Sequence, residues 1–175
     1  MKNIEDLLLK GEFSVSPTKK VRFAKANLAS KTELIFADYQ SHYGEYLTYD
    51  EAINMQKDGW RMLTKEEWKY LLSNRNQDLI YAHGRYNDNN TFIIFPDDMD
   101  GERVILPAAG YCGASSLYGD GSNGGYWSSS LGTDFPSSAW TLAFNFNNQH
   151  MNDGLRMYDF IRDNGFSVRL VRDVE

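Results

Sequence analysis

Residues 139–146 read AWTLAFNF, and this stretch decides how the second half of the chain folds. Large apolar side chains alternate strictly with small or polar ones, and side chains of a β-strand point alternately to opposite faces of a sheet. The pattern therefore predicts a strand with four inward side chains, Trp140, Leu142, Phe144 and Phe146. The outward side chains are then expected to be Thr141, Ala143 and Asn145.

The sequence around this strand lacks two residue types that ordinary surfaces use. No lysine and no glutamate occurs between Arg103 and Val174, and all nine lysines lie at or before Lys69. Residues 137–173 are rich instead in aromatic, aliphatic, Asn and Asp residues. Exposed rings beside Ser, Gly and Asn are typical of adaptable binding surfaces, because rings give contact area at low entropic cost. We therefore expect this tail to carry a binding surface.

Capping signals predict two helices in the first half of the chain. Thr48 and Thr64 each precede a glutamate by three residues, which is the spacing of a capping box. The first of these helices is expected to end at Gly59. A shorter amphipathic helix is predicted at residues 2–10.

Strands and turns are expected in the rest of the chain. Residues 13–23 predict a hairpin that turns at Ser16-Pro17-Thr18, and short apolar runs predict strands at residues 91–96, 103–111 and 166–171. We expect an α+β fold class, with two helices packed on a mostly antiparallel sheet with long loops.

Composition argues against several classes of partner. The net charge of −6 argues against nucleic acid, which requires a basic patch. No apolar run is long enough to span a bilayer, and the N-terminus does not read as a signal peptide, so we expect synthesis in the cytoplasm without membrane insertion. Cys112 is the only cysteine, which excludes an internal disulfide and a cysteine-pair metal site.

No catalytic group stands out. The acidic run at residues 97–102, DDMDGE, lacks the ligand spacing of an EF-hand calcium loop, and a solvated turn is the favoured interpretation. His42, His83 and His150 have no carboxylate at the spacing of a triad or a metal site. We expect no catalytic residue, no metal and no other cofactor.

Three stretches resemble a known group of domains: FSVSPTKKVRFAKANL (13–28), GWRMLTKEEWKYLL (59–72) and GYWSSS with GFSVRLVRD (125–130, 165–173). They are similar to Bacteroidetes-type domains related to formylglycine-generating enzymes. The resemblance implies a single domain of C-type lectin-like fold.

In this interpretation the domain spans residues 1–175, with a short N-terminal helix within 1–12 and a variable ligand-binding region at about 127–173. The last region resembles the variable segment of a diversity-generating retroelement protein, in which a reverse transcriptase randomises adenines. Asn codons altered in this way never encode Lys, Glu, Gln, Met or Trp, which would explain the missing Lys and Glu. Four tail residues would then be fixed framework positions: Trp140, Gln149, Met151 and Met157.

The resemblance implies a non-enzymatic ligand-display protein of a phage or prophage, associated with the virion tail, which binds a protein or glycan on a host cell surface. Outward tail side chains are the expected contact residues: Thr133, Asp134, Phe135, Ser137, Thr141, Asn145, Asn147, His150, Asn152, Asp153, Leu155, Tyr158 and Phe160. The rings of Phe135, Tyr158 and Phe160 are expected to dominate the binding energy.

Two alternatives stay open. The first is an invariant C-type-lectin-like domain of a bacterial surface protein, which binds carbohydrate or protein. The second is a diverged enzyme of the formylglycine-generating type, although those enzymes need a reactive cysteine pair and this chain has Cys112 alone. The calcium-dependent sugar motif of animal lectins, Glu-Pro-Asn with a later Trp-Asn-Asp, is missing, so glycan binding does not follow from the fold name.

Overall fold

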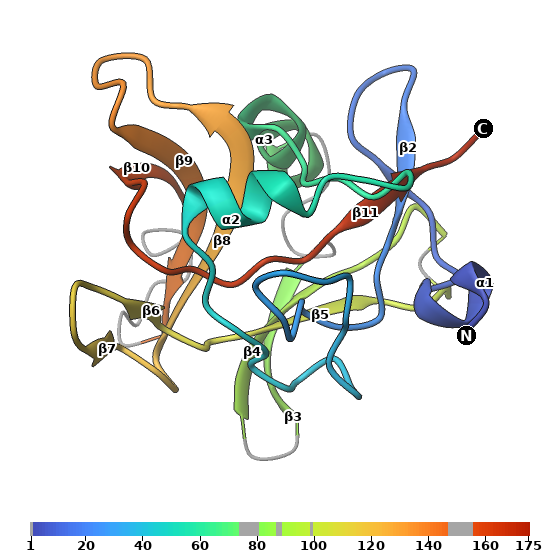
Figure 1. Cartoon of the computed structure of the whole chain (residues 1–175). Coiled ribbons are helices and arrows are strands. Elements are labelled where there is room, and N and C mark those ends of the chain that lie inside the picture. Colours follow the sequence, from blue (N-terminus) through green and yellow to red (C-terminus); the bar gives the residue numbers. More distant parts are fainter. Residues whose placement is uncertain (1, 74–80, 87–88, 99, 147–155) are drawn as a thin grey trace.

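The computed structural model describes residues 2–73, 81–86, 89–98, 100–146 and 156–175 (Figure 1). The helices in this part of the chain are α1 (Ile4–Leu7), α2 (Tyr49–Asn54) and α3 (Lys65–Ser73). The strands are β1 (Phe13–Ser14), β2 (Lys20–Phe23), β3 (Tyr81–Tyr86), β4 (Asn89–Ile94), β5 (Val104–Pro107), β6 (Tyr111–Cys112), β7 (Leu117–Tyr118), β8 (Asn123–Leu131), β9 (Ser138–Asn145), β10 (Arg156–Ile161) and β11 (Val171–Asp173).

The strands form small antiparallel sheets. Their orders are β1-β2-β11, β10-β9-β8, β3-β4-β5 and β6-β7. The last strand of the chain, β11, pairs with β2 near the N-terminus, so both ends of the chain belong to one part of the molecule (Figure 1).

The expected fold class is wrong. Instead of two helices packed on one sheet in a C-type lectin-like arrangement, the described residues form mainly small antiparallel sheets with short helices. The physical reason is helix length: α2 has 6 residues and α3 has 9. α2 ends at Asn54, before the expected end at Gly59, and the Met55 amide bonds to Ala52 O and Ile53 O. The backbone then turns at Asp58 (φ 55°) and Gly59 (φ 85°). Helices of one to three turns cover little surface, and most core residues come from the strands and from the segments between elements.

Local signals nevertheless placed several elements correctly. At α2 the Thr48 hydroxyl accepts from the Glu51 amide and the Glu51 carboxylate accepts from the Thr48 amide, so the capping box is confirmed. The same reciprocal pair forms between Thr64 and Glu67 before α3. The predicted hairpin is also confirmed, since β1 pairs with β2.

In the β10-β9-β8 sheet, β8 and β9 are covered on both faces. Tyr126 of β8 and Leu142 of β9 are paired, and they belong to a first core cluster that also contains Trp68 of α3. The adjacent Trp127 points to the other face and belongs to a second core cluster, beside Phe166 and Tyr49 of α2. Figure 1 shows α2 in front of β8. Because both faces pack against other elements, every side chain of the middle strand β9 is buried or half-buried.

The segment before β11 is buried throughout. Phe166, Val168 and Leu170 are buried as the alternation predicted, but Ser167 and Arg169 are buried too. Its backbone bonds to several partners in turn, since Gly165 pairs with Cys112 and Phe166 pairs with Leu47. The segment therefore runs through the interior between elements, and regular strand geometry begins only at Val171.

Arg169 is a buried cation held by neutral oxygens. Its guanidinium donates to Asn27 Oδ1 (2.8 Å), to Gln40 O (3.1 Å) and Oε1 (3.2 Å), and to Ile105 O (2.9 Å). Burial lowers the pKa of Arg169 to about 10. Asn27 also donates to Tyr126 Oη (3.1 Å), so one network joins five residues that are separated in the sequence: Asn27, Gln40, Ile105, Tyr126 and Arg169.

Candidate functional site

A pocket of about 260 Å³ opens where β9 ends and β10 begins. Its aromatic lining residues are Tyr111 of β6, Phe144 of β9, Tyr158 and Phe160 of β10, and Phe166 of the segment before β11. Its polar groups come from three further positions, Asn123, Asn145 and Arg156. We call this the β9–β10 pocket.

The rings pack against one another in a continuous row. The Phe166 ring stacks on Tyr111, with centroids 5.3 Å apart and planes 16° apart. Phe160 lies 5.0 Å from Phe166, and Tyr158 lies 6.0 Å from Phe160 in an edge-on arrangement. Tyr118 stacks on the far side of Tyr111 at 5.4 Å. The row passes from buried Phe166 to Tyr158 and Tyr118, which are 40% and 50% exposed.

Glycine and a backbone pair place the Phe166 ring. A Cβ on Gly125 of β8 would lie inside contact distance of that ring, so the missing side chain lets Phe166 rest directly on the sheet. Gly165, the preceding residue, exchanges two backbone hydrogen bonds of 2.8 Å with Cys112. Because Cys112 follows Tyr111, this pairing brings Phe166 beside Tyr111.

The polar groups of the pocket sit at the strand ends. Asn123 and Asn145 are directly opposite each other in the β8-β9 register. The Asn123 Oδ1 atom is buried and has no hydrogen-bond partner among the described residues. The Arg156 guanidinium lies 5.0 Å from the centre of the Tyr158 ring. Within the described lining, Arg156 is the one charged residue.

Three expected contact residues meet at this pocket. Asn145 is half-buried at the end of β9, Tyr158 is exposed, and Phe160 is half-buried and packs against the second core cluster. Tyr158 and Phe160 lie two residues apart in one strand, so they share a face of the sheet. They pair with Thr141 and Ala139 of β9.

Another group of expected residues lies in the connection between β8 and β9. Thr133, Asp134, Phe135 and Ser137 are exposed there, and Phe135 is 64% exposed. Asn145, at the other end of β9, lies roughly 25 Å from this connection at about 3.3 Å per residue. Phe160 instead pairs with Ala139 near the start of β9, so β10 extends from the pocket to the connection.

The expectation for Thr141 is wrong. Its side chain is fully buried, and its hydroxyl donates to Tyr158 O at 3.1 Å. Alternation does place Thr141 on the face opposite Leu142, but that face is covered by Trp127 and the rest of the second core cluster. Five more expected residues lie outside the described residues: Asn147, His150, Asn152, Asp153 and Leu155.

Several pocket residues were not predicted. Tyr111, Asn123 and Phe166 come from segments far apart in sequence, and only strand pairing brings them together. Arg156 could have been found, because it shares the period-2 alternation of Tyr158 and Phe160.

Two of the tail residues expected to be framework can be located. Met157 is half-buried and packs against the first core cluster, on the face opposite Tyr158. Trp140 is half-buried and lies under the Lys65 ammonium, 3.5 Å from the ring centre. Gln149 and Met151 lie outside the described residues.

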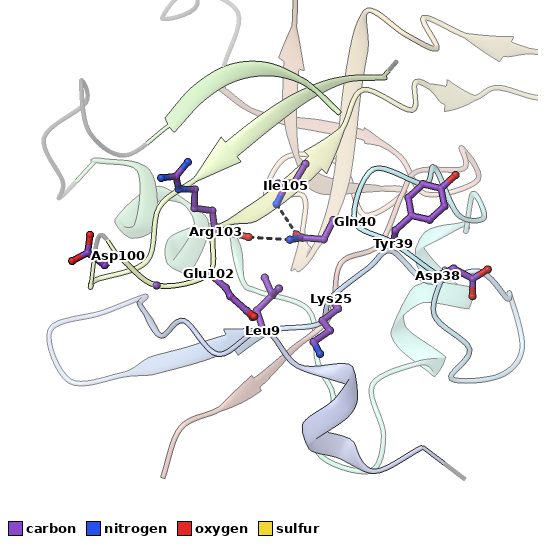
Figure 2. A pocket seen from close by; sticks show the side chains of 10 residues that line it. Leu9, Lys25, Asp38, Tyr39, Gln40, Asp100, Glu102, Arg103 and Ile105 are labelled. Atoms are coloured by element: carbon purple, nitrogen blue, oxygen red, sulfur yellow. Dashed lines mark hydrogen bonds between the residues drawn. The ribbon is translucent and has the colours of Figure 1, made fainter. Parts of the chain in front are cut away.

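A larger hollow of about 610 Å³ lies near β5, between the N-terminal segment and residues 38–40. Figure 2 shows Gln40 at its wall, where the side-chain amide donates to Arg103 O (3.0 Å) and accepts from Ile105 N (2.7 Å). Glu102, another lining residue, accepts from the Lys10 amide at 2.7 Å. These polar side chains already hold the chain together along the edge of β5, so the hollow is a weaker candidate than the β9–β10 pocket despite its size.

The acidic run at residues 97–102 has a structural role as well. Asp97 accepts from the Ser14 amide (2.9 Å) and hydroxyl (2.5 Å), and Lys20 lies 3.6 Å from it. These contacts fasten the acidic run to the β1-β2 hairpin. The interpretation as a solvated turn was therefore incomplete.

Cys112 does not have the environment of an activated nucleophile. Burial raises the pKa of its thiol, Glu45 adds to this and Lys31 opposes it. A reactive cysteine needs the opposite shift, since the thiolate is the nucleophile. Over the part of the chain that the structure describes, no three His, Cys, Asp or Glu side chains gather as metal ligands.

None of the described helices has the length and apolar character that crossing a bilayer requires. Searches against family models, curated proteins and solved structures found no match to this chain.

Proposed function

We propose that this chain is a non-enzymatic ligand-display protein that binds a macromolecule on a host cell surface through its C-terminal third. Its outward side chains at residues 127–173 would be exchanged by a retroelement, as the resemblance of this segment implies, and a phage or prophage would carry the protein on its virion. The observation that supports this best is the division of β10 into two faces.

The two faces of β10 have different partners. Met157 packs inward on the first core cluster, whereas Arg156, Tyr158 and Phe160 line the pocket. Adenine randomisation of an Asn codon cannot produce a Met codon. The proposal therefore requires Met157 to be a fixed framework residue. Tyr158 is the kind of residue that such codons do produce, and it is 40% exposed.

Exposed apolar side chains continue along the tail. Leu131, Phe135 and Ile161 are 51%, 64% and 60% exposed, and Ile161 pairs with Ser138 beside the β8-β9 connection. Clusters of exposed large apolar residues are typical of interaction sites. The connection that carries Phe135 is itself well fastened, since Ser138 donates from its amide and hydroxyl to Phe135 O.

Sequencing this gene in independent isolates tests the diversification. Differences are expected at codons for outward positions such as Phe135 and Tyr158, while the codons for Met157 and Trp140 stay constant. Differences spread evenly over the chain, or equal at buried and exposed tail positions, would contradict it.

A cell-binding assay tests the display function separately. The purified chain is expected to bind cells of a susceptible host, and Phe135→Ala or Tyr158→Ala should weaken binding at least tenfold if either ring is a main contact, since such rings often contribute more than about 1.4 kcal/mol. Lys2→Ala, at the opposite end of the chain, is the matched control. Binding that both tail variants leave unchanged would refute a contact role for the tail.

A further inference from the structure

We infer that the outer edge of β10 binds an extended segment of a partner protein, which joins the β10-β9-β8 sheet as a further antiparallel strand. The inference rests on the proposed binding function and names the kind of partner: a segment with apolar side chains at alternate positions and a basic side chain between them. It is argued from the direction of the backbone groups, the two edges of the sheet and the side chains along β10.

The hydrogen bonds between β9 and β10 reveal which backbone groups of β10 point outward. The Thr141 hydroxyl donates to Tyr158 O (3.1 Å), and the Arg162 amide donates to the carbonyl of the residue before β9 (2.9 Å). The even-numbered residues of β10 therefore direct their amide and carbonyl groups toward β9. This direction alternates along an antiparallel strand, so the backbone groups of Met157 and Asp159 point away from β9.

The two edges of this sheet differ. On the outer side of β8, the Trp127 amide donates to Ser167 O (3.2 Å) and the Ser167 amide donates to Gly125 O (3.1 Å), so the segment before β11 covers that edge. On the outer side of β10, no described residue forms a backbone hydrogen bond with Met157 or Asp159. Figure 1 shows β10 at the outside of the molecule, beside β9. Of the two edges, that of β10 can therefore accept a further strand.

β10 lacks the usual protection of an edge strand. Natural edge strands often carry a lysine, a proline or a bulge that prevents pairing with another chain. β10 contains neither lysine nor proline, and its register with β9 continues without a bulge from Arg156 to Ile161. Such an edge suits strand addition, in which the backbone hydrogen bonds provide affinity and the alternate side chains provide specificity.

One face of β10 favours apolar side chains in the added strand. Tyr158 and Phe160 point to this face and line the β9–β10 pocket, and Tyr158 is 40% exposed. Side chains directly opposite them on an antiparallel neighbour would lie about 4.5–5.5 Å away, measured between Cβ atoms. Apolar side chains at these two positions would therefore cover the exposed parts of both rings.

The other face favours a basic side chain. Asp159 is half-buried on this face, its carboxylate lies 3.4 Å from the Ser138 hydroxyl, and it forms no salt bridge with any described residue. Asp163, just after β10, is exposed and adds a second negative charge. Opposite charges directly across a ladder stabilise the pair, so a lysine or arginine opposite Asp159 fits this position.

A second copy of this chain suits the edge less well. Antiparallel pairing of two β10 strands, centred on Tyr158 or on Asp159, would set the two Asp159 side chains diagonally or directly opposite each other on one face. Like charges directly opposite destabilise a sheet, and each chain already carries a net charge of −6. A different protein is therefore the better partner for this edge.

Peptide binding to the full-length chain, measured by fluorescence anisotropy, tests the use of the backbone edge. The probe is a labelled peptide, TVTVKVTVT, capped at both ends, and we expect it to bind saturably with its lysine opposite Asp159. Methylation of the backbone nitrogens of the lysine and the next threonine, which face β10 in this register, should weaken binding at least about tenfold. Methylation of the two central valine nitrogens, which face solvent, is the matched control and should change little.

Substitutions of Asp159 test the charge. A probe with glutamate in place of lysine should bind more weakly to the wild type, and Asp159→Lys should reverse this preference. Asp159→Asn removes only the charge, whereas Asp159→Pro also removes the outward amide, which an edge strand tolerates, so Asp159→Pro should bind more weakly still. Asp38→Asn removes an exposed carboxylate at the hollow near β5 and should change nothing. Urea unfolding shows whether each variant is folded, and the methylated probes need no change to the chain.

Three results would overturn the inference. The probe could fail to bind at millimolar concentration, or the two methylation patterns could have equal effects. The wild type could also form a dimer that Asp159→Pro abolishes, which would show that a second copy covers the edge. In each case the proposed display function survives if the chain still binds host cells. If the probe binds as expected but the chain does not bind host cells, the edge assignment stands and the display proposal fails.

Discussion

Phe166 is the residue on which the geometry of the pocket depends. Its ring contacts Tyr111, Phe160 and Trp127, with centroids 5.3, 5.0 and 4.8 Å away, and it lies over Gly125. The buried closing segment thus supports the exposed rings of β10 directly. A substitution at Gly125, beneath the Phe166 ring, should therefore change both the free energy of unfolding and the shape of the pocket.

Gly125→Ala tests this support. The new methyl group would collide with the Phe166 ring, and overpacking of a filled core typically costs about 1–3 kcal/mol. We expect urea denaturation to show a loss of about 2 kcal/mol in the free energy of unfolding. Ser137→Ala, an exposed change, is the control. An unchanged midpoint for Gly125→Ala would show that Phe166 has room to move.

Arg169→Met tests the buried network. The substitution fills similar space but leaves Asn27 Oδ1 and Ile105 O without their donor, at about 1–3 kcal/mol for each buried orphan. We expect a loss of about 3 kcal/mol in the free energy of unfolding, measured by guanidinium denaturation. Arg169→Lys keeps the charge but cannot reach all of these oxygens, so it should also destabilise. If Arg169→Met is as stable as the wild type, the desolvation penalty of the buried guanidinium is as large as the stabilisation from its hydrogen bonds.

At the scale of elements, one arginine joins the start of α3 to the C-terminal strand. Arg61 donates to Glu67 Oε1 and to Asp173 Oδ1, each at 2.7 Å. Burial alone would raise the pKa of Glu67, but hydrogen bonds from Arg61 and Thr64 outweigh it and hold the pKa below its ordinary value of 4.5. The Arg61 hydrogen bond likewise lowers the pKa of Asp173 below 3.8, against a smaller effect of burial.

This link predicts a loss of stability in acid. Both carboxyl groups bind protons less readily in the folded chain, so their contribution is complete above about pH 5 and is lost as pH falls through the lowered folded pKa values. Unfolding midpoints in urea should therefore decrease from pH 5 to pH 3. Arg61→Met should be less stable at pH 6 and should lose much of that decrease. If the variant and the wild type have parallel pH profiles, the link is not responsible.

Elements set by local signals could be predicted, and elements set by distant contacts could not. The capping boxes at Thr48 and Thr64 are complete within four residues of sequence, so spacing alone reveals them. The burial of Arg169 depends on Asn27, more than a hundred residues away, and the backbone of Ser167 is paired with Gly125 and Trp127 of β8. Sequence periodicity contains no information on such distant contacts. The alternating pattern therefore predicted the burial of Phe166, Val168 and Leu170 but not that of Ser167 and Arg169.

The site was predictable to the same extent. Alternation in residues 156–161 reveals that Tyr158 and Phe160 share a face, and composition predicts, without a test so far, a binding surface in the tail. Alternation cannot tell whether a face is covered, which is why Thr141 was wrongly expected at the surface. Tyr111 and Asn123 reach the pocket only through strand pairing.

At the scale of the whole molecule, the C-terminal third contains buried and exposed side chains next to one another along the same strands. β9 is buried between two core clusters, and β10 is covered on the Met157 side while Tyr158 remains exposed. The closing segment returns through the interior to pair with β2 (Figure 1). We therefore expect the chain to tolerate changes of its exposed tail side chains while β2 and β11 stay paired.

A substitution scan across these positions tests that division most directly. Asn, Ser, Asp and His are introduced at Phe135 and Tyr158, and at buried Leu142 and Thr141, and the free energy of unfolding is measured for each variant. The account predicts changes within about 0.5 kcal/mol at the two exposed positions, and losses above about 2 kcal/mol for most variants at the two buried ones. Equal losses at exposed and buried positions would contradict it, because the tail side chains could then not be exchanged without unfolding the protein.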